Sequence, residues 1–209
     1  MTFSKEFKEA LLNLPTKEKD KLLLRLLKKD STLANRLYFE LVEGNDVDAK
    51  RSEMEARVRE QVAYAKASYH SPGYLMMDLR YLSGEINEHV KITKDKFGEI
   101  SLNLLMLNEA LEHAFPLTEP APSHKKRKLI VYIIARAFKL LVLTDNIHED
   151  YRLDLEDDMK KLGKLIGSEH SIMEEAIYHG LDVNWLSTFN IPEDIDAIHR
   201  ELRSRGYLK

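Results

Sequence analysis

Apolar residues recur at intervals of three and four along nearly the whole chain, a spacing that gives a helix one apolar face. No segment shows the strict alternation of apolar and polar residues that is typical of a half-buried strand. The 209 residues include only 8 glycines and 6 prolines, whereas a sheet protein needs many turns built from such residues. The sequence therefore predicts an all-α fold of about nine or ten helices, arranged as an irregular multi-helix bundle or as stacked helical hairpins.

Breaks between the predicted helices indicate how the chain is organised. Pro15 separates a first short helix from a second, and Gly44 suits the C-terminal cap of a third. We expect the leucines of the second helix, residues 16–29, to pack against the helices on either side of it. We expect a single all-α domain over residues 1–209, with residues 1–44 as a candidate N-terminal helical unit and a loop boundary near the proline-containing residues 116–123.

Composition limits the classes of function that the chain can have. The formal net charge is −3, so any binding to nucleic acid must depend on a local basic patch. The absence of cysteine excludes disulfides, thiol catalysis and thiolate metal ligands. The N-terminus is charged where a signal peptide needs an apolar core, and the longest apolar run, Leu129–Val142, is interrupted by Arg136 and Lys139. We therefore expect a soluble, cytoplasmic protein without a membrane span.

Charge separates sharply along residues 120–158. Residues 120–144 contain six cations and no acid, whereas residues 145–158 contain seven acids and one arginine. A short turn between predicted helices 123–143 and 147–166 makes them antiparallel neighbours, so equal rise along both helices aligns their positions. This alignment predicts that Asp150 and Asp154 face the level of Arg136 and Lys139 and pair with them. It also gathers the lysines at residues 160, 161 and 164 at the basic end.

The helix predicted at 123–143 has one polar stripe and is otherwise apolar, which indicates a nearly buried central helix. Four successive cations at its start lie beside free backbone N–H groups and form a candidate site for anions. A solvated helix end is the alternative interpretation. The candidate anion- or nucleic-acid-binding residues are Lys125, Lys126, Arg127, Lys128, Tyr132, Arg136, Lys139, Lys160, Lys161 and Lys164.

Glutamates and histidines spaced four apart suggest a second kind of site. Glu and His side chains from facing helices can build a di-metal centre, although the usual Glu-x-x-His spacing is absent here. The candidate metal ligands are Glu85, Glu88, His89, Glu109, Glu112 and His113. The two Glu-x-x-Glu pairs among them resemble the magnesium-binding helices of all-α nucleotide pyrophosphohydrolases, and this resemblance implies a metal-dependent hydrolase. The chain lacks a convincing Glu-x-x-Asp helix of that family, and exposed helix faces with stabilising pairs are the alternative.

Signatures of the common enzyme classes are absent from the sequence. It contains no Gly-x-Ser-x-Gly elbow, Walker glycine loop, dinucleotide fingerprint or His-Glu-x-x-His motif. We therefore expect a non-catalytic α-helical interaction module or scaffold that binds another protein and needs no cofactor. Binding of nucleic acid or phosphate through the basic helix end is one alternative, and the metal-dependent hydrolase is the other.

Overall fold

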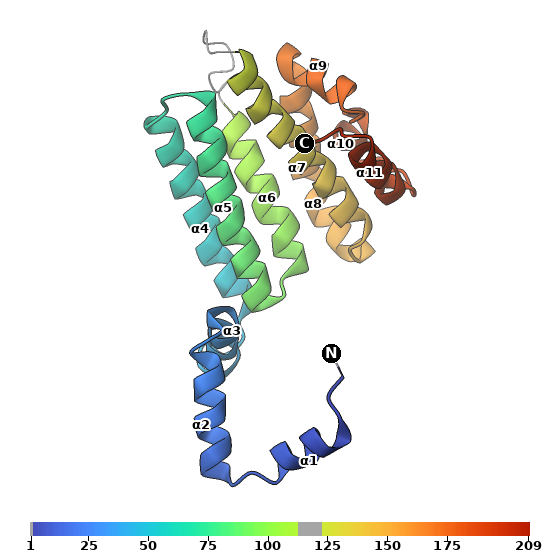
Figure 1. The fold of residues 1–209 in the computed structure, drawn as a ribbon. Coiled ribbons are helices and arrows are strands. Elements are labelled where there is room, and N and C mark those ends of the chain that lie inside the picture. Colours follow the sequence, from blue (N-terminus) through green and yellow to red (C-terminus); the bar gives the residue numbers. More distant parts are fainter. Residues whose placement is uncertain (1, 113–122) are drawn as a thin grey trace.

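The computed structural model describes residues 2–112 and 123–209, and all its regular elements are helices (Figure 1). The predicted all-α fold is therefore confirmed. The helices are α1 (Lys5–Leu12), α2 (Thr16–Leu27), α3 (Ser31–Leu41), α4 (Val47–Ala67), α5 (Pro72–Thr93), α6 (Lys96–Leu111), α7 (Ser123–Asp145), α8 (Glu149–Ser168), α9 (His170–Tyr178), α10 (Asn184–Ser187) and α11 (Ile195–Ser204). The short α10 is the one that periodicity did not separate, because four residues are too few to show a helical repeat.

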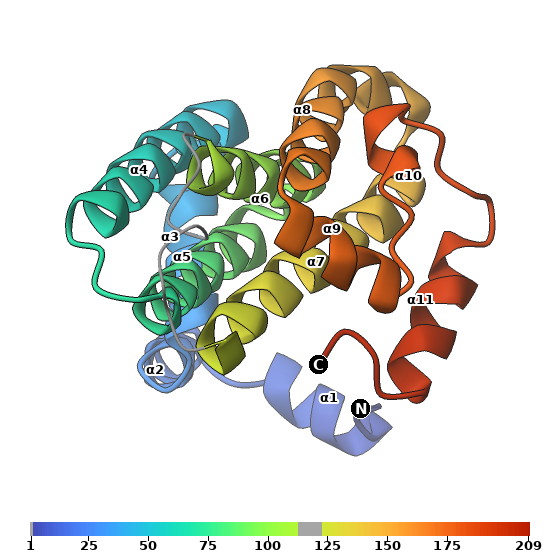
Figure 2. The same ribbon diagram turned by 90° about the horizontal axis from the view of Figure 1, so that it is seen from above.

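Helices α4, α5 and α6 lie side by side, and α7 packs against α5 and α6 (Figures 1 and 2). Helices α9 and α11 cover the other side of α7, while α8 packs against α6, α9 and α10. Side chains of α6 and α7, including Leu104, Ile134 and Phe138, are completely buried. The prediction that residues 123–143 form a nearly buried central helix is therefore correct.

The two helices α7 and α8 follow each other in the chain without packing along each other. Helix α7 packs on α5, α6, α9 and α11, whereas α8 packs on α6, α9 and α10. The prediction that they lie side by side is therefore wrong. A short connection allows two helices to be neighbours, but here the apolar faces of both pack on α6 and the C-terminal helices.

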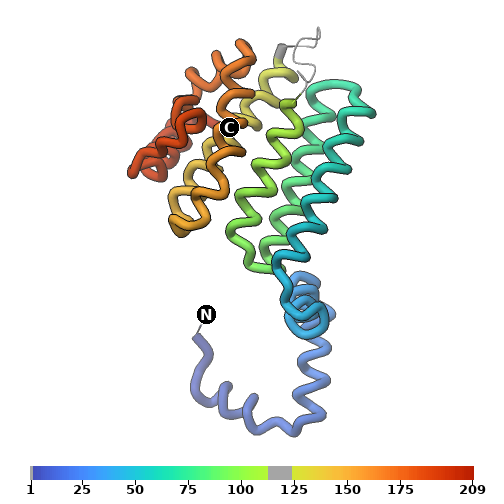
Figure 3. Tube along the Cα trace, turned by 180° about the vertical axis from the view of Figure 1, so that it is seen from behind, coloured from blue at the N-terminus to red at the C-terminus, as the bar shows by residue number. Residues whose placement is uncertain are grey.

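Helices α1 and α2 form an N-terminal arm that projects away from the rest of the molecule (Figures 1 and 3). Neither helix contains a buried residue, and Leu23, Leu24 and Leu26 of α2 are 50–60% exposed. The expectation that the α2 leucines pack against neighbouring helices is therefore wrong for these three, whereas Leu22 and Leu27 are half-buried and α2 contacts α3. Periodicity shows that a helix has an apolar face, but it does not show whether another element covers that face.

A buried ion pair ties the start of α4 to the junction between α5 and α6. Asp95 is the N-cap of α6 and accepts a hydrogen bond from the Gly98 backbone N–H at 2.8 Å. Arg51 of α4 donates to both carboxylate oxygens of Asp95, at 2.6 and 2.8 Å. A Cβ atom at residue 98 would clash with the Asp95 carboxylate. This contact explains why a glycine occupies the first turn of α6.

None of the described helices combines the length and the apolar composition that crossing a membrane requires. The predicted loop boundary at 116–123 lies outside the described residues, except for Ser123 at the start of α7.

Candidate functional site

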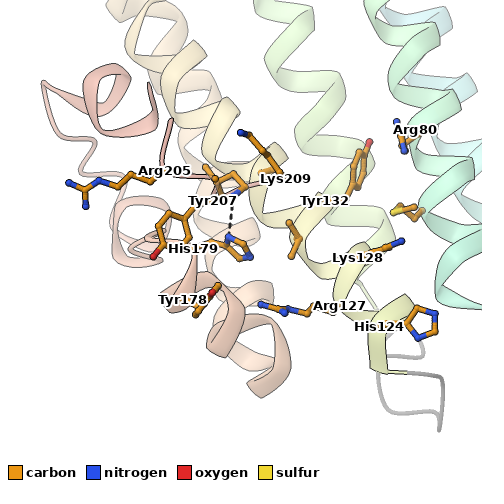
Figure 4. Close-up of a pocket in the computed structure, with 15 residues that line it drawn as sticks. Arg80, His124, Arg127, Lys128, Tyr132, Tyr178, His179, Arg205, Tyr207 and Lys209 are labelled. Atoms are coloured by element: carbon orange, nitrogen blue, oxygen red, sulfur yellow. Dashed lines mark hydrogen bonds between the residues drawn. The ribbon is translucent and has the colours of Figure 1, made fainter. Parts of the chain in front are cut away.

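A cavity of about 890 Å³ opens between α7, α9 and the C-terminal segment, with α5 completing its wall (Figure 4). Five Lys or Arg side chains and two histidines contribute to the lining, and no carboxylate side chain does. The lining residues are Met76, Arg80, His124, Arg127, Lys128, Val131, Tyr132, Ala135, Tyr178, His179, Arg205, Gly206, Tyr207, Leu208 and Lys209. We call this cavity the basic pocket.

Helix α7 presents its polar stripe to the basic pocket because its other faces are packed into the core. Arg127, Lys128 and Tyr132, all predicted as anion-binding residues, line the pocket. The Tyr132 hydroxyl donates a hydrogen bond to the Leu79 carbonyl of α5 at 3.1 Å. This bond fixes the tyrosine ring between α5 and α7, where it forms a rigid part of the wall.

Arg127 is held in place by an acid that lies behind the pocket wall. Its Nε atom lies 2.7 Å from Glu175 Oε1, and its guanidinium lies 5.4 Å from the centre of the Tyr178 ring. The hydrogen bond with Glu175 raises the pKa of Arg127, which therefore stays positively charged. Glu175 and His179 form one of the Glu-x-x-x-His pairs seen in the sequence, with 3.5 Å between Oε2 and Nε2.

His179 anchors the C-terminal segment against the pocket. The Leu208 backbone N–H donates a hydrogen bond to His179 Nδ1 at 3.1 Å, which requires that this nitrogen carries no proton. Burial lowers the pKa of His179, so the imidazole is neutral at pH 7. Leu208 is buried, and the Tyr207 ring lies edge-on to both Tyr178 and His179. The segment is thereby fixed so that Arg205 and Lys209 lie at the pocket.

Residues from four distant parts of the chain thus form the basic pocket. Its α7 cations were predicted from the sequence, whereas Arg80 of α5 and the C-terminal Arg205 and Lys209 were not. Nothing in the spacing of isolated cations places them together. The burial of Leu208 and its bond to His179 decide where the last residues lie, and both depend on tertiary packing.

Three of the predicted lysines lie away from the pocket. Lys160 pairs with Glu156 on its own helix, Lys161 pairs with Glu112 at 3.0 Å, and Lys164 is exposed on α8. None of them lines the basic pocket, because α8 does not pack along α7. Lys125 and Lys126, although they belong to α7, do not contribute to the lining either.

The remaining predicted cations, Arg136 and Lys139, line an adjoining cavity. Their predicted pairing with Asp150 and Asp154 is wrong. Lys139 pairs with Glu99 of α6 at 3.1 Å, and the Arg136 guanidinium lies 5.6 Å from the centre of the Tyr132 ring. The reason is again that α6, and not α8, lies along this part of α7.

The predicted metal ligands are distributed among separate ion pairs and hydrogen bonds. Their partners in the structure are Arg57 for Glu85 at 3.2 Å, Thr32 for Glu88 at 3.1 Å, Asp95 for His89 at 3.6 Å, Arg59 for Glu109 at 2.6 Å and Lys161 for Glu112 at 3.0 Å. His113 lies outside the described residues. Among the residues that are described, no group of three or more His, Asp or Glu side chains could hold a metal ion. The metal-dependent hydrolase remains a prediction that this geometry does not support.

The chain matches no family model, and comparisons with curated proteins and with solved structures also found no match.

Proposed function

We propose that the protein is a non-catalytic binding module that holds a phosphate-bearing anion in the basic pocket. The observation that carries this proposal is a cavity of about 890 Å³ with five Lys or Arg side chains and no carboxylate side chain in its lining. Three of the five, Arg80, Lys128 and Lys209, form no ion pair with a described residue, whereas Arg127 and Arg205 pair with glutamates. Like charges repel when they converge, so an anion in the pocket stabilises this arrangement. Arginine and lysine are also the side chains that bind phosphate oxygens most effectively.

The position of the pocket at the start of α7 strengthens the argument. His124, Arg127 and Lys128 come from the first two turns of this helix, and Figure 4 shows them along the wall of the cavity. The N-terminal end of a helix carries a partial positive charge, which attracts anions. The helix and its side chains therefore act in the same direction on a bound phosphate group.

The chemistry of the lining favours binding over catalysis. It includes no serine, threonine or carboxylate that could act as a nucleophile or a general base. Of its two histidines, His124 is exposed at the start of α7, whereas His179 is buried. His179 Nδ1 accepts a hydrogen bond from the Leu208 N–H, and its Nε2 faces Glu175. Its role in this proposal is to position the C-terminal wall.

Isothermal titration calorimetry with inorganic pyrophosphate at low and moderate salt tests the proposal. We expect salt-sensitive binding that weakens roughly tenfold or more when Lys128→Glu and Arg80→Glu are combined, since each removes an attraction and adds a repulsion. The matched control combines Lys164→Glu with Lys91→Glu, which changes net charge equally at exposed positions outside the pocket. Absence of binding at low salt, or equal weakening in both double variants, would refute the proposal.

Protein–protein contact through the N-terminal arm is a second candidate function. The observation in its favour is the exposed apolar surface of α1 and α2, where Phe7 is 50%, Leu12 73% and Leu24 60% exposed. Light scattering over a range of concentrations tests whether the arm associates with a second copy. We expect a concentration-dependent mass that returns to the monomer value in a Leu12→Glu, Leu24→Glu variant. A constant monomer mass for the unmodified chain would count against this contact.

A further inference from the structure

We infer that the ligand of the basic pocket is a single-stranded nucleic acid and that it extends into the adjoining cavity. This inference rests on the proposed anion-binding function and names the class of ligand. The adjoining cavity has a volume of about 620 Å³ and shares Arg80, Tyr132 and Ala135 with the basic pocket. Its other lining residues are Gly84, Asn87, Arg136, Lys139, His199 and Arg203, so it too has no carboxylate side chain in its lining.

Together the two cavities form a basic groove along α7. Lys128 lines one end and Lys139 the other, and the rise from residue 128 to residue 139 is roughly 16 Å along the helix axis. A single phosphate group occupies only a small part of such a length. Cations along the whole groove therefore fit a ligand that carries several phosphates in a row.

Most of the cations in the groove are available for a ligand. Glu175, Glu99 and Glu201 neutralise three of the groove cations, Arg127, Lys139 and Arg205. Five others form no ion pair with any described residue, and these are Arg80, Lys128, Arg136, Arg203 and Lys209. This excess of positive charge lies in one groove of a chain whose formal net charge is −3.

Aromatic rings in the groove distinguish nucleic acid from other polyanions. Tyr132 lies where the two cavities meet, and its hydrogen bond to the Leu79 carbonyl holds its ring in place. Tyr178 and Tyr207 line the basic pocket beside His179. Bases stack on such rings, and this combination of basic groove and aromatic side chains is typical of proteins that bind single strands. The bases of a duplex are already stacked on each other and are not available to rings inside a concave site.

The test uses fluorescence anisotropy with fluorescein-labelled oligothymidylates of 3, 6 and 12 nucleotides, a 12-base-pair duplex and a 12-residue abasic strand. We expect affinity to rise with length and the 12-mer to bind at least fivefold more tightly than the duplex and the abasic strand. The slope of log K against log salt should reach about −3.5 if all five unpaired cations contact phosphates, since each contributes roughly −0.7 for single strands. Acidic peptides such as oligoglutamate are the competitor that represents a protein ligand.

Variants at the far end of the groove separate this inference from the proposed function. Arg136→Glu combined with Arg203→Glu should weaken the binding of the 12-mer at least tenfold. The magnitude of its slope of log K against log salt should fall by about 1.4, while the affinity for pyrophosphate changes less than twofold. Tyr132→Leu should reduce the preference for the 12-mer over the abasic strand. Circular dichroism establishes that each variant is folded.

Two sets of results would overturn the inference in different ways. In the first set, pyrophosphate binds, so the anion site stands, but the oligonucleotide results contradict the single-strand assignment. That assignment is wrong if the 12-mer binds no more tightly than the 3-mer. It is also wrong if the duplex, the abasic strand or oligoglutamate binds as tightly as the 12-mer. If neither pyrophosphate nor any oligonucleotide binds at low salt, the proposed function and the inference both fail.

Discussion

Replacing Asp95 with asparagine tests how the junction of α4, α5 and α6 is stabilised. Burial by itself would raise the pKa of this carboxyl group, but the His89 imidazole 3.6 Å away and the hydrogen bonds from Arg51 and the Gly98 N–H lower it from 3.8 to about 2. A lowering of nearly two units corresponds to roughly 2.5 kcal/mol of stabilisation at pH 7, at 1.36 kcal/mol per unit. Because the Asp95 side chain is only 3% exposed, solvent screening does not reduce this figure much.

We expect Asp95→Asn to lower the free energy of unfolding by about 2–3 kcal/mol at pH 7. Asparagine is also a good N-cap, so the bond from the Gly98 N–H is kept and the loss reports the charge. The assay is urea unfolding followed by circular dichroism at 222 nm. Asp48→Asn is the control, because Asp48 contacts the same Arg51 at 2.9 Å but is 88% exposed, so its loss should stay below about 1 kcal/mol.

The pH dependence of this difference has a definite sign. The native pKa of Asp95 lies below the unfolded value, so its stabilisation is complete above about pH 5 and disappears as the pH falls toward 2. Roughly half of the difference between the wild type and Asp95→Asn should remain at pH 3. Equal stabilities at pH 7, or a difference that does not change between pH 7 and pH 3, would show that the Asp95 charge does not stabilise this junction.

Three further predictions concern stability and use the same unfolding assay. Gly163→Ala should cost about 1–3 kcal/mol, because its Cβ would lie 2.6 Å from the Ser187 backbone nitrogen where α8 meets α10. Tyr132→Phe should cost about 0.5–1.5 kcal/mol through loss of the hydrogen bond to the Leu79 carbonyl. Burial lowers the pKa of His199 in the folded protein, so below about pH 6.5 this imidazole takes up a proton more readily in the unfolded chain. Acidification should therefore lower the free energy of unfolding, and His199→Phe should make that decrease smaller.

Sequence periodicity predicted the helices well because each is a local consequence of residue spacing. The same spacing placed Lys128 and Tyr132 on one face of α7 and its apolar residues in the core, as the structure confirms. Periodicity failed where the partner of a face had to be known. It predicted that α8 lies beside α7, whereas α8 packs on α6. It also predicted that the α2 leucines are buried, whereas Leu23 and Leu26 are exposed.

The candidate site was only half predictable for the same reason. Its α7 cations are consecutive in the sequence, whereas Arg80 and Lys209 are separated from them by long stretches of chain. Lys209 reaches the pocket because Leu208 is buried and bonded to His179. Such a contact leaves no pattern in the sequence, since a single leucine near the C-terminus is compatible with many positions.

The most direct test of the proposed anion site is a titration of the ¹⁵N-labelled protein with pyrophosphate, followed by backbone amide chemical shifts. We expect the largest shifts around the basic pocket, at residues 127–132 of α7, near Arg80 and at residues 205–209. The site is supported if shifts at those positions saturate in the unmodified protein and are absent in the Lys128→Glu, Arg80→Glu variant. Shifts confined to the lysines of α8 or to the N-terminal arm, or no shifts at low salt, would contradict it.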